Sequence, residues 1–210
     1  MKSLYLLLLA AAVTPAFAQN AAAASTNKLS YDRVSASYSS NKVCSGMGLG
    51  ATAQLGSNFL IGGSYSDIDY KKNLDGVTGT TTGFGIGYKV SAGLGDIILS
   101  LGYAQLQAGG VVSSVAVVAA AEQTSYGIGY RVKLNSEVEL SADYTRRKVN
   151  TVSGAYDLSS GESAAEGTSE TYNDFGISAR YNINKSFDIT AGYNFSSSAN
   201  TWSLSAGYNF

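Results

Sequence analysis

Few residues of this chain could carry out chemistry, and their types exclude the common enzyme sites. The 210 residues include no histidine and a single cysteine, Cys44. Without histidine, neither a Ser–His nor an Asp–His pair can be built, and metal sites made of His or Cys clusters are excluded. We therefore expect no enzyme, no cofactor and no metal. One cysteine cannot form an internal disulfide, so Cys44 is interpreted as an incidental residue of an exposed loop, with a reactive or intermolecular thiol as the alternative.

Charged residues within alternating segments are the remaining candidates. Nine of them fall on the small, polar side of an apolar–polar alternation: Arg33, Lys89, Arg131, Glu139, Asp143, Arg147, Asp174, Arg180 and Asp188. If that side faces the interior of a barrel, five basic and four acidic side chains share one narrow space. Isolated charges there are costly, so we expect ion pairs between strands that fill and lock the lumen. A charged constriction in a thin water path is the functional alternative.

The elements that must position these charges are β-strands. Apolar and small polar residues alternate with a period of two at 34–38, 47–53, 59–65, 84–90, 97–103, 126–132, 138–144, 175–183, 187–195 and 202–210. Period-two alternation predicts half-buried strands. Short connections rich in Gly, Asn and Ser at 55–58, 91–96, 134–136 and 184–186 alternate with long ones at 70–80, 107–123 and 150–171. Short turns at one end and long loops at the other are typical of outer-membrane barrels.

The composition decides which face of each strand looks outward. The chain has 24 Gly, 15 Tyr and one Pro, and the bulky Tyr, Phe, Leu and Ile share one face while Gly, Ser and Thr share the other. A closed barrel has little room inside, so the bulky apolar face should meet lipid. Aromatic residues gather near both ends of the strands, as at two membrane interfaces. We predict one domain at 29–210, a closed antiparallel up-and-down transmembrane β-barrel of ten strands, with eight as the alternative.

The N-terminal residues have the layout of a secretory signal peptide. A short positive start precedes an apolar run at 4–13 and the cleavage pattern Ala16-Phe17-Ala18. The run is about half the roughly 20 residues that a spanning helix needs. We expect a cleaved signal at 1–18 and a flexible lead at 19–28. The formal net charge of −1 leaves no basic excess to attract nucleic acid.

The signal peptide, the Gly- and Tyr-rich strands and the final Tyr208-Asn209-Phe210 resemble small bacterial outer-membrane proteins of the OmpX-like, opacity-type porin group. The resemblance implies an outer-membrane location and lipid and lipopolysaccharide as surroundings. It also implies that the barrel-assembly machinery reads the aromatic face of the last strand: Trp202, Leu204, Ala206, Tyr208 and Phe210.

Four basic residues form a second candidate site. Arg146 and Lys148 should lie on the lipid side at the outer rim, and Lys71 and Lys72 in a nearby loop. Such residues could bind lipopolysaccharide phosphates. The alternative, which has equal weight, is that they are solvent-exposed basic residues of a loop without a ligand.

Two long loops complete the expectations. The apolar stretch 109–121 should contact lipid, the lumen or a partner, or else extend the strands, whereas 153–170 should be a flexible acidic loop. We expect a structural or surface-interaction role through these loops, with a narrow passive channel for small solutes or ions as the alternative. A monomer is favoured.

Overall fold

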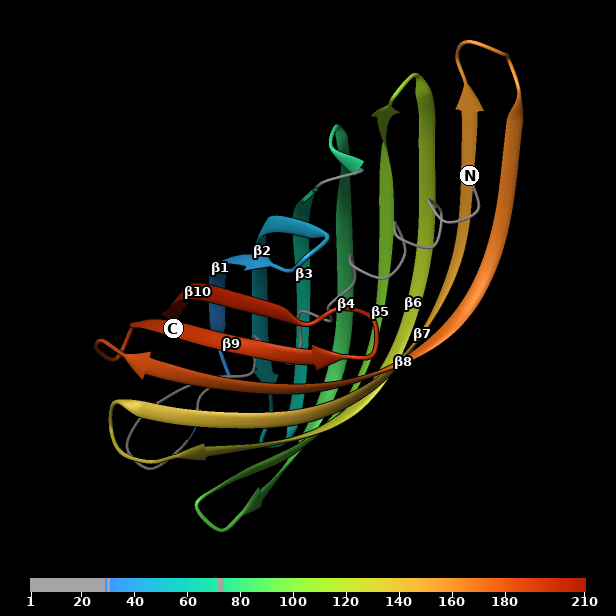
Figure 1. Cartoon of the computed structure of the whole chain (residues 1–210). Helices are drawn as coiled ribbons and strands as arrows, with labels where there is room; N and C mark the ends of the chain where they lie inside the picture. Colours follow the sequence, from blue (N-terminus) through green and yellow to red (C-terminus); the bar gives the residue numbers. More distant parts are fainter. Residues whose placement is uncertain (1–28, 30, 72–73) are drawn as a thin grey trace.

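The chain forms a closed antiparallel barrel of ten strands, as the computed structural model shows (Figure 1). The structure describes residues 29, 31–71 and 74–210, so the expected signal peptide and lead lie outside the described residues. The strands are β1 Arg33–Ser40, β2 Cys44–Leu55, β3 Phe59–Tyr70, β4 Val77–Ala92, β5 Gly95–Val112, β6 Val115–Lys133, β7 Val138–Asp157, β8 Ser163–Asn182, β9 Phe187–Ser196 and β10 Thr201–Asn209. The predicted ten-strand barrel is thereby confirmed. Within the described residues, no helix is long and apolar enough to cross a membrane.

Closure comes from the pairing of the first strand with the last. β1 and β10 run antiparallel from Arg33 opposite Asn209 to Ser40 opposite Trp202. Each of the strands β2 to β9 pairs with the strand before it and the strand after it in the sequence. Each strand therefore has partners on both sides at the level of this seam, and no backbone edge is left open there.

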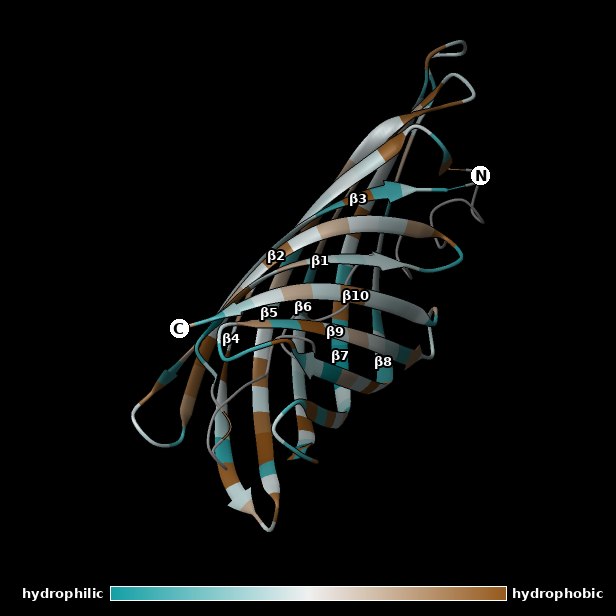
Figure 2. Ribbon diagram, turned by 90° about the vertical axis from the view of Figure 1, so that its left-hand side faces the viewer, coloured by the Kyte–Doolittle hydropathy of each residue, from teal (hydrophilic) through white to brown (hydrophobic). Residues whose placement is uncertain are grey.

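The barrel is apolar outside and polar inside. Met47 on β2 and Phe84 on β4 are 70% and 62% exposed on the outer face, whereas Arg33 and Arg131 are each 1% exposed on the inner face. Figure 2 shows hydrophobic and hydrophilic residues following one another along the strands. Successive side chains of a strand point to opposite faces, so the alternation of the sequence becomes this division.

The long connections predicted at 107–123 and 150–171 are wrong, because most of these residues continue the strands, whereas the one predicted at 70–80 is present but shorter, since β4 already begins at Val77. β5 and β6 pair up to Val112 opposite Val115, and Ser113 and Ser114 alone make the turn, with φ of 47° and 68°. β7 and β8 pair up to Tyr156 opposite Ser163, so the segment expected to be a flexible acidic loop is largely a hairpin. Alternating Val, Ala and Thr residues let the ladders continue past the expected strand ends.

Strand length differs greatly around the barrel. β4 to β8 have 16 to 20 residues, while β1, β9 and β10 have 8 to 10. Figure 1 shows the three long hairpins, β3–β4, β5–β6 and β7–β8, rising beyond the short strands on one side. We call this the hairpin end and the opposite one, with the turns at 56–58, 93–94, 134–137 and 183–186, the turn end.

Candidate functional site in the barrel lumen

Seven charged side chains of alternating sign line the lumen near the turn end, and we call them the charge ring. In order around the wall, from β1, β9, β8, β7, β6, β5 and β4, they are Arg33, Asp188, Arg180, Glu139, Arg131, Asp96 and Lys89. All seven are buried. The register places them at one level, since Glu139 faces Arg180 across β7–β8 and Asp96 faces Arg131 across β5–β6.

Asp188 is the most heavily bonded member of the charge ring. Arg33 donates from Nη2 to Asp188 Oδ1 at 2.6 Å and from Nε to Oδ2 at 3.2 Å. Arg180 Nε lies 3.3 Å from Oδ1, and Asn209 Nδ2 donates to Oδ2 at 3.0 Å. A Cβ at Gly207 would occupy the space of the Arg33 guanidinium, so the missing side chain there makes this geometry possible.

The other side of the charge ring holds two further ion pairs. Arg131 donates to Glu139, which also accepts from Asn182 Nδ2 at 3.2 Å. Lys89 Nζ lies 3.8 Å from Asp96 Oδ2. Asp96 is a functional residue that sequence reasoning missed, because we assigned it to a turn rather than to the inner face of β5.

Tyr31 covers one part of the charge ring, at Lys89, Asp96 and Arg131. Its hydroxyl donates to Asp96 Oδ2 at 2.7 Å, and its ring centroid is 4.8 Å from Lys89 Nζ and 5.0 Å from Arg131 Cζ. The side chain is fully buried. Cation–π contacts of this kind let one aromatic ring cover two cations. Tyr31 precedes the first strand and follows no alternation, so no sequence pattern indicated its place.

A second polar layer lies nearer the hairpin end, around Arg147 on β7. Arg147 Nε donates to Asp174 Oδ2 at 2.5 Å, Nη2 donates to Ser198 Oγ at 2.9 Å, and Cζ lies 4.8 Å from the ring centroid of Tyr172. Asp143 points inward between the two layers, but it makes no ion pair with any residue that the structure describes. The structure therefore brings eight of the nine predicted lumen charges into ion pairs and leaves Asp143 apart.

The hairpin end of the lumen is apolar. A buried cluster fills it from β2 to β8, and we call it the mouth cluster: Cys44, Ile68, Tyr70, Leu74, Val77, Ala104, Leu106, Ala108, Val117, Ala121, Val149 and Tyr172. Leu74, in the connection between β3 and β4, is 2% exposed and folds into the mouth. The expected exposed loop position of Cys44 is wrong, because Cys44 begins β2 and is 6% exposed. The mouth cluster includes Val117 and Ala121 from the apolar stretch 109–121, for which contact with the lumen is one of the predicted alternatives.

The turn end opens into a vestibule of about 930 Å³. Its wall includes Lys89, Asp96 and Asn182, which belong to or contact the charge ring, and its rim carries Lys133 and Lys185. The vestibule connects the charge ring with the outside of the barrel at the turn end.

The four basic residues considered for lipopolysaccharide do not form one cluster. Arg146 and Lys148 are exposed on the outer face of β7. Lys71 instead points to the turn between β1 and β2, where Nζ donates to Ser40 Oγ at 2.6 Å and to the Asn41 carbonyl at 3.1 Å. Lys72 lies outside the described residues.

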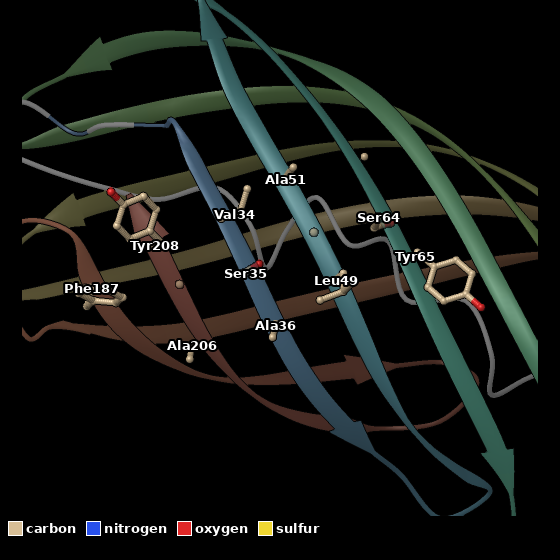
Figure 3. A pocket seen from close by; sticks show the side chains of 13 residues that line it. Val34, Ser35, Ala36, Leu49, Ala51, Ser64, Tyr65, Phe187, Ala206 and Tyr208 are labelled. Carbon is tan, nitrogen blue, oxygen red and sulfur yellow. The ribbon is translucent and has the colours of Figure 1, made fainter. Parts of the chain in front are cut away.

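The outer wall at the β1–β10 seam has a shallow apolar groove of about 640 Å³. Figure 3 shows its floor of small side chains, Ala36, Ala51 and Ala206, with Tyr65 at one side and Phe187 and Tyr208 at the other. The five residues expected to form an assembly signal are all exposed on this face of β10 or directly after it. Phe187 and Tyr208 make an edge-on ring pair with centroids 5.3 Å apart.

Known proteins resemble this chain in fold alone. No family model and no curated protein matches this chain. It is similar to the solved KdgM porin in complex with disordered oligogalacturonate, at 8% identity over 85% of this chain and 99% of that chain, with a TM-score of 0.44. The outer membrane protein Ail of Yersinia pestis is also similar, at 18% identity over 85% of this chain and 98% of that chain, with a TM-score of 0.40. Omp33 of Acinetobacter baumannii is similar at 12% identity over 85% of this chain and 98% of that chain, with a TM-score of 0.38. The similar solved structures are bacterial outer-membrane β-barrel proteins.

Proposed function

We propose that this chain is an outer-membrane barrel with a closed lumen that holds a rigid sheet above the cell surface for interaction with other molecules. The mouth cluster carries this proposal, because an apolar plug at the hairpin end is incompatible with a steady water path. The turn end then faces the periplasm and the hairpin end faces outward, since long connections of such barrels are extracellular.

The outer face supports the membrane location. Outward-facing apolar residues run from Leu134, directly after β6, to Tyr126 within it, and exposed Thr124 and Glu122 follow. Eight residues at about 3.3 Å each, inclined by about 40°, span roughly 20 Å of membrane height. This approaches the apolar band of about 25 Å that such barrels present to lipid.

The β7–β8 hairpin supports the interaction role. β9 begins to pair with β8 only at Asp174, opposite Ser196. The outer part of β8, from Ser163 to Tyr172, therefore has a strand partner on the β7 side alone among the described residues. A free strand edge with unpaired backbone groups is a template for an added strand of another protein.

A refolded barrel in a planar bilayer tests the closed lumen. We expect no steady channel steps for the wild type, and regular single-channel steps would favour the passive channel instead. Cells displaying the chain test the interaction role, with immobilised serum proteins and cultured epithelial cells as probes. Shortening the β7–β8 hairpin between 150 and 171 should lower binding, while shortening the β9–β10 turn at 197–200 serves as the matched control. Equal binding by both variants would contradict a role for the free edge.

A further inference from the structure

The charge ring has more positive than negative groups. It contains four cations, Arg33, Arg180, Arg131 and Lys89, and three carboxylates. We propose that the ring binds one small oxyanion of the phosphate class, which reaches it from the periplasmic vestibule. This inference rests on the lumen alone and does not depend on the surface-interaction role.

Unpartnered guanidinium nitrogens are the main observation. Arg180 Nη1 and Nη2, Arg33 Nη1 and Arg131 Nη1 are buried and have no hydrogen-bond partner among the described residues. The three arginines are 1–3% exposed. A buried donor without an acceptor costs free energy, and a charged donor costs more. Four such nitrogens in one layer therefore call for an acceptor that the described side chains do not supply.

The three arginines belong to one connected group. Asp188 joins Arg33 to Arg180, and Glu139 accepts from Arg131 while facing Arg180 in the β7–β8 register. The ion pairs use one side of each guanidinium and leave the remaining nitrogens for a shared ligand.

The wall above the ring has space for a small ligand. The next inward positions towards the hairpin end are mostly small, among them Gly87, Gly129, Ser141, Ser178 and Thr190, and the Asp143 carboxylate lies beside Gly176 one position further on. A small pocket of about 50 Å³ also touches Arg131, Ser141 and Asp143. Space of this order suits an inorganic ion and excludes a sugar or nucleotide.

The donor type selects the class of anion. Planar guanidinium groups bind the paired oxygens of phosphate or carboxylate through two parallel hydrogen bonds. A tetrahedral oxyanion offers four acceptor oxygens to such nitrogens, and its negative charge offsets the excess positive charge of the ring. Lys133 and Lys185 at the vestibule rim favour the approach of an anion from the periplasm.

Equilibrium dialysis of inorganic phosphate against the folded barrel, in an uncharged maltoside detergent at constant ionic strength, tests the proposal. We expect one phosphate per chain, displaced by sulfate but not by chloride. Arg180→Lys keeps the positive charge but loses the paired guanidinium nitrogens that make two parallel hydrogen bonds, so the phosphate affinity of this variant should fall about tenfold or more. Arg146→Lys makes the same change on the outer face and should bind as the wild type does.

A second measurement keeps the test independent of how well the variant folds. Heat-modifiable gel migration must show that Arg180→Lys is folded before its affinity is compared. If it is not, the unfolding temperature of the wild type is compared in phosphate and in gluconate of equal ionic strength, and phosphate should raise it. No bound phosphate, equal displacement by chloride, or equal affinity of both variants would each overturn the proposal.

Discussion

Asp188→Asn should destabilise the barrel more than any change of an exposed carboxylate. Asp188 accepts from Arg33 at 2.6 and 3.2 Å and from Asn209 at 3.0 Å, and it lies 3.3 Å from Arg180 Nε. Asparagine keeps the volume and one acceptor but removes the charge. Both arginines then stay buried without a carboxylate, and the excess of positive charge in the ring doubles.

The magnitude follows from the cost of breaking a buried ion pair. Removing one partner of such a pair costs about 3–5 kcal/mol, because the other charge remains desolvated. Here two arginines lose the same partner, so we expect a loss of free energy of unfolding of at least about 3 kcal/mol. Since about 1.4 kcal/mol is a factor of ten, the folded-to-unfolded ratio should fall more than about a hundredfold.

Urea unfolding of the refolded barrel in detergent or lipid is the assay. Trp202 is the single tryptophan and lies on the outer face, so its fluorescence follows the loss of the apolar environment. Asp69→Asn, on an exposed position of β3, is the control and should change the free energy by less than about 0.5 kcal/mol. If Asp188→Asn is as stable as this control, the charge ring does not hold the barrel together and our reasoning fails.

Three further predictions concern other parts of the molecule. Asp143→Asn should leave the free energy of unfolding unchanged or raise it in the same urea assay, because Asp143 is partly buried without an ion pair; a loss like that of the charge ring would show a partner we have missed. Leu74→Ser should raise the rate at which a membrane-impermeant maleimide labels buried Cys44 by more than about tenfold, because truncating a buried leucine costs about 2–5 kcal/mol; an unchanged rate would argue against a mouth closed by Leu74. Hydrogen bonds from Ser159 hold the pKa of Asp157 below its usual range, so the order they give the β7–β8 tip is present above that range and is lost as the pH falls through the lowered pKa. Protection of the Ser159 amide, which is its exchange rate relative to an unstructured peptide at the same pH, should be lost only in acid for the wild type and be absent at every pH in Asp157→Ala.

The sequence predicted the strands better than it predicted their ends. The alternation around Tyr88 or Leu204 is enough to place a strand and its two faces, because side chains of a strand point alternately to either side. It was not enough at 107–123, where small Val and Ala residues are equally compatible with a loop and with a strand. Whether such a segment pairs depends on its neighbour, and the neighbour is known only when the chain has folded.

By itself, the sequence determined the class of this protein through ten alternating segments, each with a bulky apolar face and with small and charged residues opposite. The tertiary structure decided which charges meet. The pairing of Asp96 with Lys89, the place of Tyr31 among the cations and the unpartnered nitrogens of Arg180 depend on barrel register and strand tilt. A period of two indicates which face a residue occupies, but it holds no information about the level in the lumen at which residues of different strands come together.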